Sequence, residues 1–73
     1  MAEKSYVLVE VSWDKSGVNT KTRPVARREY KAEIFSLKRK LKHIMEVDGL
    51  YGARKCLEIW EVEPAFGEGH YID

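Results

Sequence analysis

Hydrophobic and polar positions alternate most clearly in residues 5–13, near the start of the chain. A period of two together with many β-branched side chains predicts a β-strand. We expect the side of this strand that faces the core to carry the odd-numbered residues Val7, Val9, Val11 and Trp13. The turn-forming residues 14–17, which end in a glycine, follow directly and predict a reversal of the chain.

The pattern in residues 24–35 fits two structures. Tyr30, Ile34 and Leu37 recur at the helical intervals of four and three, yet Tyr30, Ala32 and Ile34 also alternate as they would in a strand. We favour a strand near 25–34 followed by a helix at 36–47, because Ser36 is a good N-cap and a sheet of only two strands is marginal in water. If 24–35 is helical, the order of elements becomes β-α-β.

A helix over residues 36–47 is predicted whichever structure residues 24–35 adopt. Its buried stripe consists of Leu37, Leu41, Ile44 and Met45. Gly49 suits the left-handed residue that often follows a helix. Residues 55–63 predict the last strand, which Pro64 ends, and its core side carries either Leu57 and Ile59 or Trp60 and Val62.

These elements predict an α+β fold of the order β-β-α-β, in which one helix packs on a short sheet. A chain of 73 residues has room for one domain. We expect this domain to span residues 1–63 and residues 64–73 to form a flexible C-terminal tail. Hydrophobic residues at 44% and charged residues at 34% are typical of neither a disordered nor a membrane protein.

The sequence also indicates in which cellular compartment the protein is expected. No apolar run approaches the roughly 18 residues of a membrane span, and the first residues lack the apolar core of a signal peptide. The single cysteine, Cys56, suits a reducing compartment. We therefore expect a cytoplasmic monomer that binds no membrane.

No residues are spaced as an active site requires. Cys56 lies in the middle of an apolar strand, and His43 and His70 form no ligand spacing with it. Glu61 and Glu63 look like solvated residues at the end of a strand rather than an acid–base pair. We expect a protein that is not an enzyme and that uses neither a cofactor nor a metal ion.

The formal charge is unevenly distributed along the chain. Residues 1–14 sum to −2, residues 15–42 to +8 and residues 43–73 to −5, which gives the net charge of +1. Such a separation creates a field that steers charged partners. The candidate partner-binding residues are Arg23, Arg27, Arg28, Lys38, Arg39, Lys40 and Lys42. The alternative is that the basic segment 21–42 binds RNA or DNA through its phosphates.

In its size, its order of elements over residues 5–63 and its split charge, the chain resembles small phage-encoded proteins that bind the host RNA polymerase. The resemblance concerns organisation and not motifs, so it assigns no site residue. It implies a non-enzymatic regulator, present in the host cytoplasm, that binds bacterial RNA polymerase or an associated transcription factor and inhibits or modifies transcription.

Overall fold

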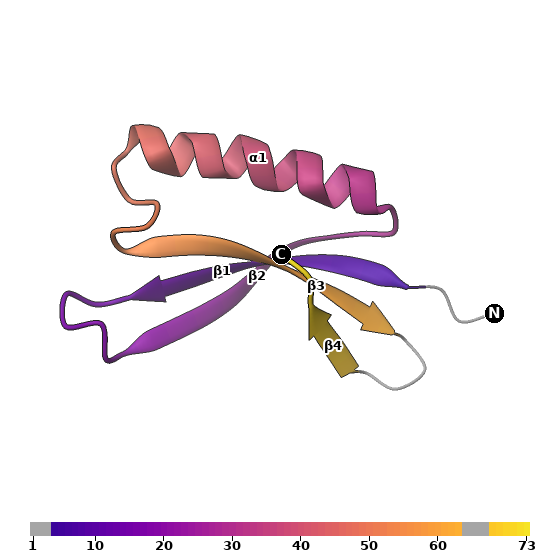
Figure 1. The fold of residues 1–73 in the computed structure, drawn as a ribbon, viewed down its shortest axis with the longest axis horizontal. Coiled ribbons are helices and arrows are strands. Elements are labelled where there is room, and N and C mark those ends of the chain that lie inside the picture. Colours follow the sequence, from indigo (N-terminus) through magenta and orange to yellow (C-terminus); the bar gives the residue numbers. More distant parts are fainter. Residues whose placement is uncertain (1–3, 64–67) are drawn as a thin grey trace.

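The computed structural model describes residues 4–63 and 68–73, and it shows one helix on a four-stranded antiparallel sheet (Figure 1). Along the chain the elements are β1 (Ser5–Trp13), β2 (Thr20–Arg28), α1 (Lys31–Val47), β3 (Lys55–Glu63) and β4 (Glu68–Tyr71). The strands lie in the order β2-β1-β3-β4, so β1 and β3 are central and β2 and β4 are the edges. The predicted α+β class is confirmed.

The sheet has one strand more than the predicted order β-β-α-β. β4 pairs antiparallel with β3, with Tyr71 opposite Trp60. Beyond β4, the N–H of Ile72 donates to the carbonyl of Ile59 at 2.9 Å. The segment 64–73, expected to be a tail, thus contributes an edge strand, although residues 64–67 lie outside the described residues. The sequence of β4 shows no alternation, so this strand is recognised only by its pairing with β3.

α1 begins earlier than predicted. The strand expected near 25–34 is wrong in its second half, since β2 already ends at Arg28 and the helix starts at Lys31. Tyr30 is the N-cap residue, in extended conformation and without a capping side-chain bond, so the N-cap role expected for Ser36 is also wrong. The cause is Ile34, which is completely buried and extends the helical stripe by one turn.

The core lies between α1 and the two central strands. The buried side chains of its central cluster are Leu8, Ile34, Leu57 and Ile59. Leu37, Leu41 and Met45 pack against this cluster, as the helical spacing predicts. Ile44 does not, because 57% of it remains exposed on the side of the helix, and its expected place in the stripe is wrong.

β1 faces the core with the side opposite to the one expected. Leu8 is fully buried and pairs with Ile59, and Tyr6 packs beside it. The odd-numbered residues of β1, predicted to line the core, therefore point away from α1. Of these residues only Val11 is buried, as predicted, although it lies on that other face. Alternation alone does not show which face of β1 meets the helix, because both faces of this central strand carry large apolar residues.

Both predicted chain reversals are present. Gly17, in the turn between β1 and β2, has a φ of 74°, and Gly49, just after α1, has a φ of 73°. Side chains rarely adopt this left-handed backbone, so glycine is suited to both positions. The N–H of Asp48 donates to the carbonyl of Ile44 at 3.1 Å and ends the helix where the sequence predicted.

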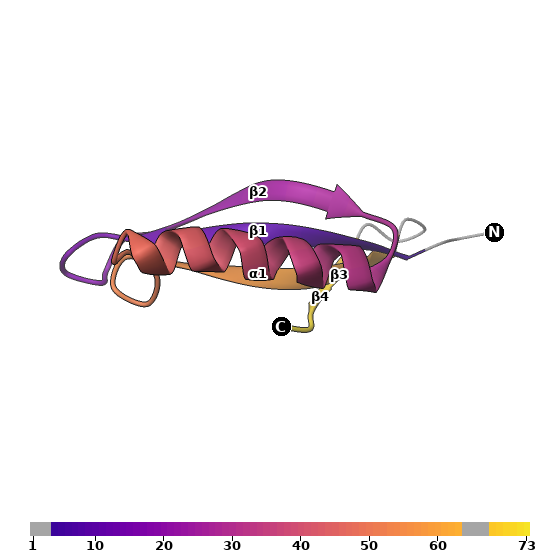
Figure 2. The same cartoon turned by 90° about the horizontal axis from the view of Figure 1, so that it is seen from above.

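The molecule is a thin two-layer structure that measures 44 × 25 × 15 Å. Seen from above, α1 runs along β1 and β3, whereas β2 lies beside the helix (Figure 2). Of the nine residues of β2 only Ala26 is even half-buried. This exposed edge strand carries much of the basic segment.

Candidate partner-binding surface

The seven predicted partner-binding residues are divided between two elements. Arg23, Arg27 and Arg28 lie on the edge strand β2, and Lys38, Arg39, Lys40 and Lys42 lie on α1. The structure does not bring all seven together. Their contacts separate those that hold the fold from those that are free to meet a partner.

Two of the β2 arginines are engaged within the chain. Arg23 pairs with Glu10 on β1, with 3.2 Å between Nη2 and Oε2. Arg27 donates from Nε to the hydroxyl oxygen of Ser5 at 2.9 Å, on the face of the sheet away from α1. Arg28 only donates to the neighbouring main-chain carbonyl of Arg27, at 2.7 Å. Its charge is left without an acidic partner among the described residues.

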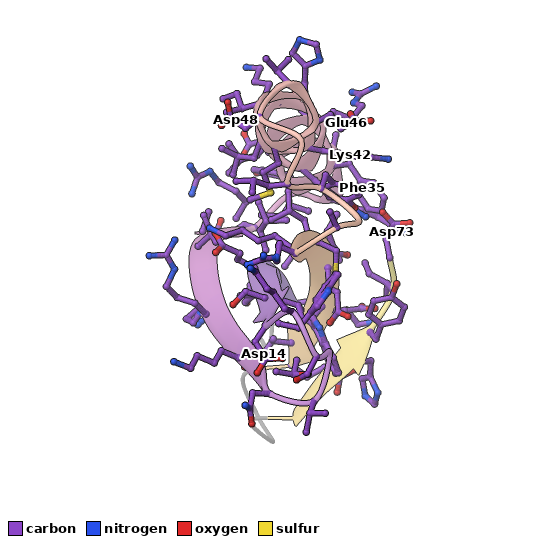
Figure 3. All side chains as sticks on the ribbon, turned by 90° about the vertical axis from the view of Figure 1, so that its left-hand side faces the viewer. Asp14, Phe35, Lys42, Glu46, Asp48 and Asp73 are labelled. Carbon is purple, nitrogen blue, oxygen red and sulfur yellow. The ribbon has the colours of Figure 1, made fainter. Side chains whose placement is uncertain are left out.

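Lys38 acts as a tie between the helix and the end of the chain. Its Nζ lies 2.6 Å from the carboxylate of Asp73 and donates to the main-chain carbonyl of the same residue at 3.1 Å. Only 14% of the Lys38 side chain is exposed. Figure 3 shows Asp73 beside α1, on the same side as Lys42 and Phe35. We therefore assign Lys38 to the fold rather than to a binding surface.

The other helix cations differ in how far they are held. The Nζ of Lys42 lies 5.1 Å from the centre of the Tyr51 ring, a cation–π contact. Arg39 and Lys40 are exposed and have no acidic partner among residues 4–63 and 68–73. Lys40 and Arg28 line one shallow groove between the end of β2 and α1, together with Ala32, Glu33, Ser36 and Leu37.

Arg28 and Lys40 line the groove, whereas Arg39 follows Lys38 on α1, is exposed and is not among the residues that line it. We call these three cations, Arg28, Arg39 and Lys40, the basic surface. It combines side chains from an edge strand and a helix, which no local sequence pattern joins. The sequence named all three residues. It could not show that Lys38, their neighbour in the chain, points to Asp73 instead.

Acids and bases lie on opposite sides of β1. β2 contains four bases and no acid, whereas β3 contains three glutamates and one lysine. Within the described residues only two of the ten bases in 15–42 form ion pairs, namely Arg23 with Glu10 and Lys38 with Asp73. The positive segment is therefore largely uncompensated by the negative one. Its cations remain available to an external partner.

The titratable groups outside this surface form no reactive cluster in the described part of the chain. Burial and the nearby Glu58 raise the pKa of the Cys56 thiol, which disfavours the nucleophilic thiolate. No three His, Cys, Asp or Glu side chains gather as metal ligands in residues 4–63 and 68–73. His43 is exposed on α1, far along the chain from His70 on β4.

One surface was missed by the sequence reasoning. The sheet face away from α1 carries the odd-numbered residues of β1 together with Trp60 on β3 and Tyr71 on β4. The sequence contained an indication of this surface, because β1 and β3 each carry apolar residues at both odd and even positions. Alternation by itself assigns only one side of β1, the odd-numbered residues, to the core and leaves the other side to solvent.

Comparison with known proteins adds no relative, since no protein-family model, curated protein or solved structure matches the chain. Among the described residues no helix is both long enough and apolar enough to cross a membrane.

Proposed function

We propose that this chain is a non-enzymatic regulatory binding protein whose basic surface docks on an acidic surface of the bacterial transcription machinery, RNA polymerase or an associated factor. In this proposal the protein is phage-encoded and acts in the host cytoplasm. It modifies transcription by occupying a site on its partner, so it needs no chemistry of its own.

The observation that carries the proposal is the uncompensated charge of β2 and α1. Like charges held close together repel one another, and a folded chain gains nothing from leaving them unpaired. Arg28 and Lys40, drawn from different elements, flank one groove. A partner carboxylate placed there interacts with both cations, and an acidic region around it extends the attraction to Arg39.

Binding to purified bacterial RNA polymerase tests the proposal. The double variant Arg28→Glu/Lys40→Glu reverses both charges at the groove and is expected to weaken binding by at least about 30-fold, because like charges then face each other. The matched control, Lys15→Glu/Lys21→Glu, makes the same change in net charge at the hairpin end of the sheet. We expect that control to lower affinity only slightly, through weaker long-range attraction.

Two results would contradict the proposal. One is the absence of binding between the unaltered chain and either the core or the holoenzyme form of the polymerase. The other is equal loss of affinity in both double variants, which would indicate attraction without a defined docking site.

Binding of bare oligonucleotides at several salt concentrations distinguishes the nucleic-acid alternative from the protein-partner proposal. Phosphate binding weakens linearly in log salt, with a slope set by the number of phosphates neutralised. Retention of single- or double-stranded DNA or RNA with that salt dependence would support the alternative and overturn the protein-partner proposal.

A further inference from the structure

The face of the sheet away from α1, which we call the open face, is covered by no described helix or strand (Figure 1). Residues opposite each other in an antiparallel ladder share a face, so the register defines its members. Its apolar side chains are Val7, Val9, Val11, Cys56, Trp60, Val62 and Tyr71. A sheet with one solvated side normally presents polar residues there.

Most of these apolar residues are partly exposed and lie next to one another across the strands, whereas Val11 is itself buried. Val7 lies opposite Trp60 on the neighbouring strand, and Trp60 lies opposite Tyr71 on the next. The two aromatic rings meet edge to face, with centroids 5.8 Å apart and planes at 70°. Tyr71 is still 58% exposed. Continuous apolar surface of this kind marks an interaction site.

Two pairs of polar groups on the open face are hydrogen-bonded within the chain. Arg27 donates to Ser5, whose side chain is among the buried ones. The indole N–H of Trp60 donates to the carboxylate of Glu58 at 3.0 Å. These four groups therefore keep a hydrogen-bond partner when the face is removed from water.

The charges of the open face select its partner. Glu58, beside Trp60, repels phosphate, and Arg27 on β2 is the one base of the ladder positions that share this face. A nucleic acid or a strongly charged protein is thus disfavoured here. The two charges lie on opposite sides of β1. A two-fold rotation that places β2 of one copy over β3 of another brings Arg27 near Glu58 twice.

The size of the open face also fits a second copy. Strands of nine residues are about 30 Å long, and four strands spaced by about 4.8 Å give a footprint of roughly 500 Å². Two such faces bury roughly 1,000 Å² or more, which reaches the lower range of specific interfaces. Stacked antiparallel sheets keep their strands nearly aligned, which matches a two-fold axis along β1.

We propose that two copies of this chain associate through their open faces. The dimer is a four-layer structure with the sheets inside and a helix on each outer side. It replaces the monomer expected from the sequence. It leaves the basic surface exposed on both copies and is independent of the function proposed above.

Sedimentation equilibrium of the full chain at concentrations from about 1 µM to 1 mM, which spans weak to moderate affinities, tests this proposal. The mass is expected to rise with concentration from that of the 8.5 kDa chain to twice that value. Val9→Lys places a charge in the middle of the open face and is expected to abolish the dimer. The matched control, Val47→Lys on α1, is expected to dimerise normally because Val47 is already 73% exposed.

A charge exchange keeps the test valid if Val9→Lys fails to fold. Arg27→Glu and Glu58→Arg are each expected to weaken the dimer by about tenfold, since each brings like charges together. The double exchange restores opposite charges and is expected to recover most of that loss. Circular dichroism verifies the fold of each variant.

Three results would overturn the proposal: an unaltered chain that stays at the monomer mass throughout, a folded Val9→Lys variant that still dimerises, or a double exchange no better than the single ones. The variant Arg28→Glu/Lys40→Glu is expected to dimerise like the unaltered chain. Loss of polymerase binding and loss of the dimer are thereby distinguished.

Discussion

At the scale of single residues, side chains of the same type on one helix have very different roles. Ile34 is completely buried, whereas Ile44 is 57% exposed on the same helix. Lys38 is tied to Asp73, whereas Arg39, the next residue, is exposed. Direction around the helix, and not residue type, decides which side chains hold the fold.

Ile34→Ala is expected to lower the free energy of unfolding by about 3 kcal/mol, because truncating a fully buried isoleucine removes apolar contacts and leaves a cavity. Ile44→Ala makes the same change at an exposed position and is expected to shift stability by about 0.5 kcal/mol or less. Urea denaturation followed by circular dichroism measures both. Equal effects of the two substitutions would contradict the assigned orientation of α1.

The turn between β1 and β2 depends on the charge of Asp14. Its carboxylate accepts hydrogen bonds from the Ser16 hydroxyl at 2.6 Å and from the Asn19 amide at 2.7 Å. These bonds lower the pKa of Asp14 from 3.8 to about 2. Because the folded pKa is the lower one, the charge stabilises the fold above the unfolded pKa, and this contribution is lost as the pH falls towards 2.

Asp14→Asn removes that charge and is expected to destabilise the protein by a constant amount above pH 4, while the difference from the unaltered chain shrinks between pH 4 and pH 2. Urea titrations at several pH values measure the difference. A difference that does not depend on pH would show that the carboxylate charge has no part in the turn.

At the scale of elements, the sequence correctly predicted the strands whose hydrophobic pattern is compatible with a single type of secondary structure. The limits of β1 and β3 were correct, because alternating strands bounded by turn residues or proline leave little choice. The start of α1 was wrong because Tyr30, Ala32 and Ile34 suit a helix and a strand equally. β4 was missed because its residues Glu68–Tyr71 have no pattern of their own.

β4 and the residues after it are expected to stabilise the sheet. Ending the chain at residue 67 removes the strand, the packing of Ile72 on the core and the Asp73 ion pair. We expect a loss of about 2 kcal/mol, mainly from the apolar burial of Ile72. Thermal unfolding of the shortened chain measures it.

Asp73→Ala is the control for that truncation, because it removes the ion pair and keeps the strand. Its expected cost is about 1 kcal/mol or less, since the carboxylate is 46% exposed. If this single substitution destabilised as much as the truncation, the ion pair and not the strand would hold the end of the chain.

At the scale of the whole molecule, the thin fold presents two surfaces of different chemistry. The basic surface lies at β2 and α1, and the open face lies on the other side of the sheet. Charge is readable from the sequence, so the residues of the basic surface were predicted. The open face was not, because the sequence does not tell which side of a sheet its one helix covers.

The position of β1 in the sheet has a consequence for the synthesis of the protein. β1 pairs with β3 from Ser5 opposite Val62 to Ser12 opposite Lys55, so β1 leaves the ribosome about 40 or more residues before the central strand with which it pairs. The core is therefore complete only after Leu57 and Ile59 have been synthesised and can pack against Leu8 and Ile34. Such long-range pairing slows folding. A nascent chain that stalls before β3 cannot complete this sheet.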